Sequence, residues 1–121
     1  MKYLILDSFL SSEDAAALRY ATDMFIHVQV SDAYSSSVQE YLLCNKKVIN
    51  GSWLRYDEFE DNGKAPYFVV DNFGTLSETI VKAYNSPNKV LSARARQFII
   101  NGGTKTMIKN WNAFFESCVS E

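Results

Sequence analysis

The chain has 121 residues, of which 47% are hydrophobic and 14% aromatic, and its formal net charge at pH 7 is −2. This length predicts a single domain over residues 1–121, and the aromatic content excludes an intrinsically disordered chain. No stretch approaches the roughly 20 consecutive apolar residues that a transmembrane helix requires, so we expect no membrane partner. The short apolar run at the start does not suit a signal peptide, and the two cysteines form no CxxC motif, so we predict a cytoplasmic protein.

The first part of the chain predicts alternating strands and helices. Residues 3–6 are typical of a short buried strand, and Ser11, followed by two acidic residues, is typical of a helix N-terminus. Alternating apolar residues over positions 26–30 predict a half-buried strand with His27 on its polar face. Ser37, with a glutamate three residues later, has the spacing of a capping box and predicts a second helix.

The middle of the chain predicts strands joined by a tight turn. Asn50-Gly51 lies between runs of strand-forming residues and suits a type I′ turn, because both residues tolerate positive φ. The pattern therefore predicts a β-hairpin with strands over residues 46–49 and 52–59. A third strand is expected over residues 67–73.

The last part of the chain predicts helices. Thr75 opens a further capping box, and Pro87 suits the first position of a helix that Gly102 would end. A final helix carries an apolar stripe over residues 107–118. Together these elements predict an α+β domain. Its small mixed or antiparallel sheet would have about four or five strands, including the hairpin, with helices packed mainly on one face.

Charge is distributed unevenly along the chain. Residues 1–63 contain five basic and ten acidic residues, whereas residues 64–121 contain seven basic and four acidic ones. Six basic residues and no acidic residue lie between Glu78 and Glu116. This polarity favours an anionic partner for the C-terminal half and a cationic partner for the N-terminal half.

A glycine turn before the predicted last helix lies within the basic segment. Small residues let backbone amides approach a ligand, and the helix N-terminus and Lys105 add positive charge, so the turn could bind an anion. The turn is not a P-loop, because Thr104 separates Gly103 from Lys105. A simple turn between helices beside a solvated basic face is the alternative interpretation. The candidate anion-binding residues are Arg94, Arg96, Gly102, Gly103, Thr104, Lys105 and Lys109.

An acidic run over residues 57–61 is the second candidate. An EF-hand is excluded: in a loop that begins at Glu58, the twelfth position is Val69, where a bidentate glutamate is needed. The run is typical of a charged turn, and its functional alternative is an acidic patch that meets a basic site on a partner. The candidate partner-binding residues are Trp53, Arg55, Asp57, Glu58, Glu60 and Asp61.

Catalytic motifs are scarce in the sequence. A single histidine, His27, excludes a two-histidine iron triad and leaves too few ligands for a zinc site, and no GxGxxG motif follows a strand. Asp71, at the end of a predicted strand, is the one residue that we weigh as a catalytic acid. We therefore predict no metal and no cofactor, and assign no catalytic residue.

Three functional hypotheses follow from these patterns. We favour a small non-enzymatic binding protein, such as an inhibitor or a modulator of the kind found in mobile elements, which acts by contact with a protein partner. The alternative is a protein that binds a phosphate-bearing ligand, either nucleic acid or a nucleotide, through the basic segment 82–109. The third is a carboxylate-dependent enzyme. A homo-oligomer is compatible with each of them.

Overall fold

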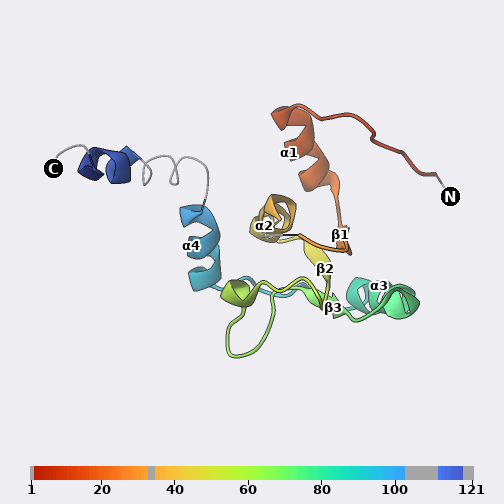
Figure 1. The fold of residues 1–121 in the computed structure, drawn as a ribbon. Coiled ribbons are helices and arrows are strands. Elements are labelled where there is room, and N and C mark those ends of the chain that lie inside the picture. The colour runs from red at the N-terminus through yellow and green to blue at the C-terminus, as the bar shows by residue number, and fades with distance from the viewer. Residues whose placement is uncertain (1, 33–34, 103–111, 119–121) are drawn as a thin grey trace.

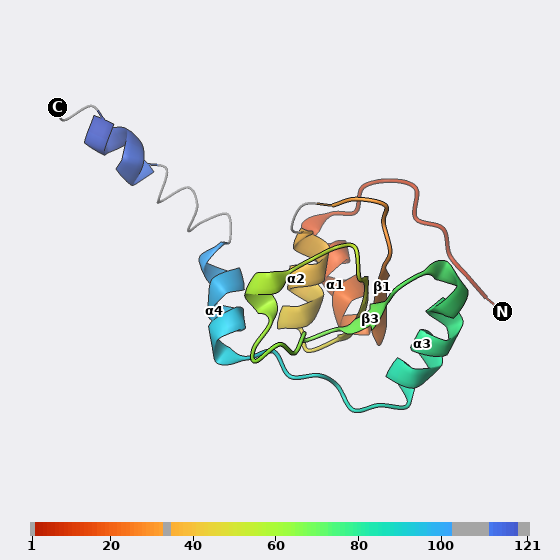
Figure 2. The same ribbon diagram turned by 60° about the horizontal axis from the view of Figure 1, so that its bottom comes forward.

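The computed structural model describes residues 2–32, 35–102 and 112–118 of the chain. Three short strands form one sheet in the order β1-β2-β3, and helices lie on both of its faces (Figures 1 and 2). The elements in chain order are α1 (Ser12–Ala21), β1 (Met24–His27), α2 (Ser36–Leu43), β2 (Lys47–Gly51), the 3₁₀ helix η1 (Asp57–Phe59), β3 (Phe68–Val70), the 3₁₀ helix η2 (Phe73–Thr75), α3 (Leu76–Tyr84), α4 (Ala93–Asn101) and a helical stretch over residues 112–118.

The three strands run parallel to one another. Ile49 of β2 lies opposite Ile26 of β1 on one side and Phe68 of β3 on the other. Parallel neighbours need a crossover connection, and α2 provides it between β1 and β2. Residues 52–67, which include η1, connect β2 to β3.

Neighbouring residues of β2 enter two separate hydrophobic cores. Val48 is buried against one face with Val38 and Leu42 of α2, whereas Ile49 is buried against the other face with Ala83 of α3. Successive side chains of a strand point to opposite faces of the sheet, so one helix on each face is needed to cover both sets. β2 is therefore the central and most buried strand.

Serine side chains cap the starts of α1, α2 and α4, and at α2 the cap is Ser35 rather than the predicted Ser37. Ser11 Oγ accepts a hydrogen bond from the backbone N–H of Asp14 at 3.1 Å, which confirms the predicted start of α1. Ser92 Oγ accepts one from the N–H of Ala95 at 3.0 Å, so α4 begins six residues after the predicted start at Ser86-Pro87. The cap bonds satisfy amides that the first turn of a helix leaves without an internal partner.

The predicted mixed or antiparallel sheet of four or five strands is wrong, because the described residues form a three-stranded sheet that is entirely parallel. Asn50-Gly51 is the end of β2 rather than a hairpin turn, and neither residue has the positive φ that a type I′ turn requires. Residues 3–6 lie outside the sheet, and the helices cover both faces instead of mainly one. No helix in the described parts of the chain is long and apolar enough to span a membrane.

Candidate functional site

Several polar segments lie at the end of the sheet where its three strands finish. The parallel strands β1, β2 and β3 end at His27, Gly51 and Val70, and their carboxyl ends therefore share one edge. The loops after β1 and β3 lead from this edge into the N-termini of α2 and α3. We call this region the carboxyl edge and define it as residues 28–32, 35–37, 51–56 and 71–76.

A buried chain of hydrogen bonds joins two strand ends to the loop after β1. His27 is 2% exposed and Asn50 is fully buried. His27 Nδ1 lies 2.9 Å from Asn50 Oδ1, and His27 Nε2 lies 3.0 Å from Asp32 Oδ2. The Asn50 amide is held in place because its Nδ2 donates to the carbonyl oxygens of Gly51 at 3.2 Å and of Leu54 at 2.6 Å.

The orientation of the Asn50 amide determines what His27 does. Since Asn50 Oδ1 can only accept, His27 Nδ1 carries a hydrogen and donates it. Nε2 faces the Asp32 carboxylate at 3.0 Å, and the Asp32 side chain is 25% exposed. With both ring nitrogens occupied inside the protein, His27 acts as a positioning residue for Asp32. The sequence pattern predicted that His27 lies on a polar strand face, but the side chain is buried.

Gly51 and Trp53 form the second part of the carboxyl edge. Trp53 Nε1 donates to the carbonyl oxygen of Gln29 at 2.6 Å, which ties the loop after β2 to the loop after β1. A Cβ at Gly51 would lie only 2.6 to 2.8 Å from three atoms of the Trp53 ring, so the ring packs directly on the glycine. The Trp53 ring is 6.1 Å from the ring of Phe73, and these side chains are 38% and 66% exposed.

Tyr56 contacts the start of α2 through its hydroxyl group. Its side chain is buried, and its hydroxyl accepts a hydrogen bond from the backbone N–H of Ser35, the N-cap of α2, at 3.2 Å. Burial raises the pKa of Tyr56, and the negative charge of Asp32 raises it further against the opposing effect of the Ser35 hydrogen bond. The phenol is therefore a neutral structural group at physiological pH.

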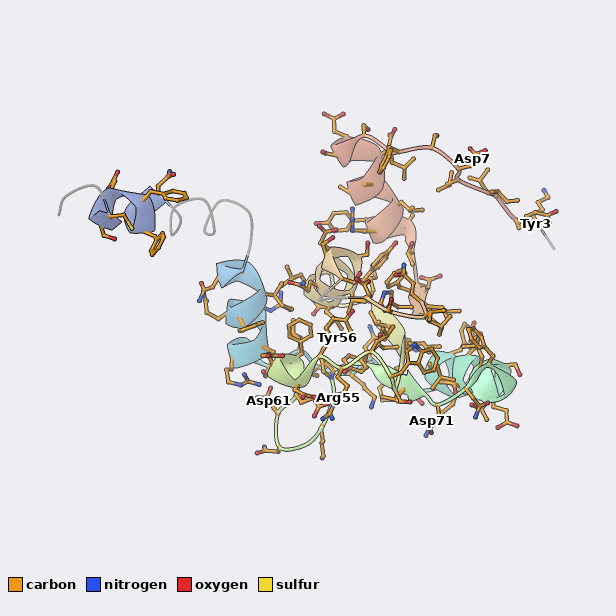
Figure 3. All side chains as sticks on the ribbon, viewed as in Figure 1. Tyr3, Asp7, Arg55, Tyr56, Asp61 and Asp71 are labelled. Atoms are coloured by element: carbon orange, nitrogen blue, oxygen red, sulfur yellow. The ribbon has the colours of Figure 1, made fainter. Side chains whose placement is uncertain are left out.

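These groups give the carboxyl edge three kinds of binding surface. The first turn of α2 presents backbone amides and the positive end of the helix dipole, over the sequence Ser35-Ser36-Ser37. Trp53 and Phe73 offer exposed ring faces. The carboxylates of Asp32 and Asp71 can accept hydrogen bonds from hydroxyl groups, and Figure 3 shows Asp71 between the sheet and α3.

The two arginines of the predicted anion site bind groups of the protein itself. Arg94 Nε lies 2.9 Å from Asp61 Oδ1, and Arg94 Nη2 donates to the Glu60 carbonyl at 2.5 Å. Arg96 donates to the carbonyl of Leu43 at 3.2 Å and to Asn45 Oδ1 at 3.0 Å, and so ties α4 to the end of α2. Gly102 ends α4, with its N–H bonded to the Phe98 carbonyl at 3.1 Å. The other predicted residues, Gly103, Thr104, Lys105 and Lys109, lie outside the described residues.

The predicted partner-binding residues are spread over two regions. Trp53 belongs to the carboxyl edge, whereas Asp57, Glu58 and Glu60 lie in or next to η1. Arg55 pairs with Asp57 at 3.2 Å, in addition to the pair between Arg94 and Asp61. Figure 3 shows Arg55 and Asp61 on this part of the molecule, apart from Asp71. The docking of a partner on these residues stays a prediction.

The ion pair at Asp61 predicts a specific pH dependence of stability. A hydrogen bond from Ser92 and the adjacent Arg94 lower the pKa of Asp61 below its ordinary value of 3.8. Because the folded-state pKa is the lower one, the stabilisation is present above pH 3.8 and is lost as the pH falls through the folded pKa. Asp61→Asn should therefore be less stable than the wild type at pH 7, and the two should converge in acid. Chemical denaturation between pH 2 and 7 measures this difference.

The contribution of Arg94 can be separated in the same experiment. In an Arg94→Ala background, the substitution Asp61→Asn should cause a smaller pH-dependent difference, because only the Ser92 bond remains. A difference as large as in the wild-type background would show that Arg94 does not hold Asp61 in solution.

A surface hollow of about 670 Å³ lies away from the carboxyl edge. It adjoins the loop after η1 and the segment before α4, and Lys64 and Lys89 are its basic residues. Asp61 also lines it, so the hollow carries both signs of charge. It is one competing location for an anionic ligand, and a second hollow, lined by Lys82 and Lys89, adjoins α3.

Sequence reasoning missed Asn50, Asp32 and the Ser35–Ser37 turn as parts of one site. Asn50 was assigned to a turn because Asn-Gly is a strong local signal, although here its amide is buried with three polar partners. The detectable signal was the short apolar run before it, followed by a second such run at Phe68–Val70. Short apolar runs that each end in polar residues are typical of buried parallel strands.

No known protein family, no curated protein and no solved structure matches this chain. The functional conclusion therefore depends on the chain's own residues and on the geometry given above. Two facts carry most weight: the parallel direction of the strands, and the position of the α2 and α3 N-termini at the edge where those strands end.

Proposed function

We propose that this chain binds a phosphate-bearing small molecule of the nucleotide class at its carboxyl edge. The single observation that carries the proposal is the three-stranded parallel sheet from whose carboxyl edge α2 and α3 begin. In open α/β sheets, ligands bind outside the carboxyl ends of the strands, where neighbouring connections lead to opposite faces of the sheet. Here α2 and α3 lie on opposite faces. The proposal keeps the nucleotide alternative drawn from the sequence and moves its site from the basic segment to this edge.

Each chemical part of a nucleotide has a complementary group at the carboxyl edge. The phosphate would lie at the first turn of α2, where backbone amides and the helix dipole favour an anion. The base would stack on the exposed ring of Trp53 or Phe73, a contact typically worth about 1–3 kcal/mol. The ribose hydroxyls would donate to Asp32 or Asp71. His27 would hold Asp32 in position through the 3.0 Å contact.

The charges of the other candidate surface favour this assignment. Arg94 and Arg96 are bonded to Asp61, Asn45 and backbone carbonyls, so a ligand would have to displace internal partners to use them. At the start of α2 the N–H groups of Ser35 and Val38 already donate to the Tyr56 hydroxyl and to Ser35 Oγ. The N–H groups of Ser36 and Ser37, which have no partner within the helix, are the amides that would bind the phosphate.

Titration with nucleoside diphosphates tests the proposal. ADP, GDP, UDP and CDP, with inorganic phosphate for comparison, would be titrated into the full chain by calorimetry. We expect at least one diphosphate to bind more tightly than phosphate alone, because the ring and ribose contacts add to the phosphate contact. No binding by any of the four would contradict the proposal.

Ser36→Asp should weaken that binding by about tenfold or more, through repulsion of the phosphate at the helix N-terminus. The fold should be retained, because an acidic residue in the first turn of a helix is stabilising. Ser77→Asp is the matched control, since it makes the same change in the first turn of α3. An equal loss of nucleotide affinity in both variants would exclude the α2 site. A third variant, Lys89→Ala, tests the hollow, and a loss of affinity only in this variant would also exclude the α2 site.

A further inference from the structure

The outer edge of β1 has no strand beside it in the part of the chain that the structure describes. β1 pairs with β2, and the sheet order places β1 at one end. Along such an edge, alternate backbone N–H and C=O groups point outward without a partner. Native proteins usually pair or cover an exposed strand edge, so this edge is suited to receive a further strand.

An exposed segment with the properties of a strand lies near the start of the chain. Tyr3, Leu4, Ile5 and Leu6 are 82%, 81%, 74% and 49% exposed. Figure 3 shows Tyr3 and Asp7 on an extended stretch that stands clear of the sheet. Aromatic and aliphatic side chains of this kind favour a buried strand, yet among the described residues these four side chains stay half to four-fifths exposed.

α1, which follows the segment, also lacks part of its packing. None of its residues is buried, and Leu18 remains 41% exposed. α1 lies beside α2 (Figure 2), where Arg19 pairs with Glu40 and its guanidinium carbon lies 6.0 Å from the centre of the Tyr41 ring. α1 therefore lies on the α2 side of the sheet, with none of its own residues buried.

The handedness of crossover connections indicates on which side of β1 a strand that precedes α1 would lie. A strand–helix–parallel strand unit is right-handed in nearly all proteins. α2 crosses from β1 to β2 on one face, so a preceding crossover that runs on the same face must come from a strand on the outer side of β1. The connections also fit: residues 7–11 would form the first loop and residues 22–23 the second, both within the usual lengths.

We propose that residues 3–6 close onto the outer edge of β1 as a parallel strand, so that the arrangement in the structure is the open position of a strap. Closure would cover Leu18 of α1 and Ile26 of β1, which is 39% exposed. It would also bring Asp7 to the carboxyl edge, beside the loop that holds Asp32. This last consequence rests on the proposed function, whereas the closure itself does not.

Hydrogen exchange of the full chain without ligand tests the closure. We expect the amides of residues 4–6 to exchange about 100-fold more slowly than in an unfolded chain, as expected for a strand held in a sheet. Exchange of these amides at unfolded rates would overturn the proposal. Because the measurement uses the wild-type chain, it does not depend on whether a variant folds.

Two proline variants show whether the protection comes from strand pairing. Ile5→Pro removes a strand amide and should abolish protection both in residues 3–6 and at the outward amides of β1. Phe9→Pro makes the same change outside the strand and should leave both intact. Unchanged protection in Ile5→Pro would overturn the pairing.

The mass of the protein in solution distinguishes the strap from an exchange between copies. Light scattering should show a monomer whose residues 4–6 are protected. A dimer with the same protection would overturn closure within one chain, because the edge would then be filled by a second copy. If the chain binds nucleotide but residues 4–6 are not protected from exchange, only the strap proposal is contradicted. If residues 4–6 are protected but no nucleotide binds, only the proposed function is contradicted.

Discussion

Asn50→Ala is expected to lower the free energy of unfolding by about 2–4 kcal/mol, because it leaves buried polar groups without partners. The substitution removes the acceptor of His27 Nδ1 and the donor to the carbonyls of Gly51 and Leu54. Asn50 is fully buried, so water cannot easily replace these bonds. Denaturation by urea, followed by circular dichroism, gives the change in free energy.

Asn88→Ala is the matched control for this prediction. The Asn88 side chain also donates to a backbone carbonyl, that of Asn45 at 2.8 Å, but the bond is exposed. Its removal should cost no more than about 0.5 kcal/mol, as for most surface substitutions. Equal effects of the two substitutions would mean that the buried network around His27 does not stabilise the fold.

Gly51→Ala is expected to cost about 1–3 kcal/mol, as overpacking of a tight site usually does. The new Cβ would lie 2.6 to 2.8 Å from Trp53 ring atoms, so the ring must move and lose its 2.6 Å bond to the Gln29 carbonyl. Tryptophan fluorescence should change together with stability. Nucleotide binding should weaken as well, because Trp53 is one of the two proposed stacking surfaces.

A second glycine and a double variant provide the controls. Gly102→Ala places a Cβ at ordinary contact distances of 3.5 and 3.6 Å from two carbonyl oxygens and should be nearly neutral. In a Trp53→Ala background, Gly51→Ala should lose most of its cost, because the clashing ring is gone. A full cost in that background would contradict the role given to the ring.

Local signals predicted local features of the fold. The serine cap at Ser11 was confirmed, and so was a helix that begins after Thr75. The predicted turn at Asn50-Gly51 is wrong because tertiary contacts override turn propensity. The Asn50 side-chain amide bonds to His27 and to the Leu54 carbonyl, and neighbouring residues in the sequence do not indicate these contacts. The predicted hairpin implied an antiparallel pair of strands, whereas the described strands are all parallel.

The candidate site could be predicted only in part, because its contacts join residues far apart in the chain. The sequence shows both charges of the Arg94–Asp61 pair but not that they neutralise each other across 33 positions. Likewise, Trp53 was singled out as a ring for a partner, whereas its place at the carboxyl edge follows from the bond to the Gln29 carbonyl. Strand direction decides which loops meet, and single residues carry little information about it.

The most direct test of nucleotide binding at the carboxyl edge is an NMR titration of the ¹⁵N-labelled chain with the tightest-binding nucleoside diphosphate. We expect the shift changes to concentrate in residues 28–32, 35–37, 51–56 and 71–76, with the largest at Ser36 and Ser37. Changes confined to the hollow around Lys64 and Lys89 would contradict this expectation and place the ligand beside β3 instead.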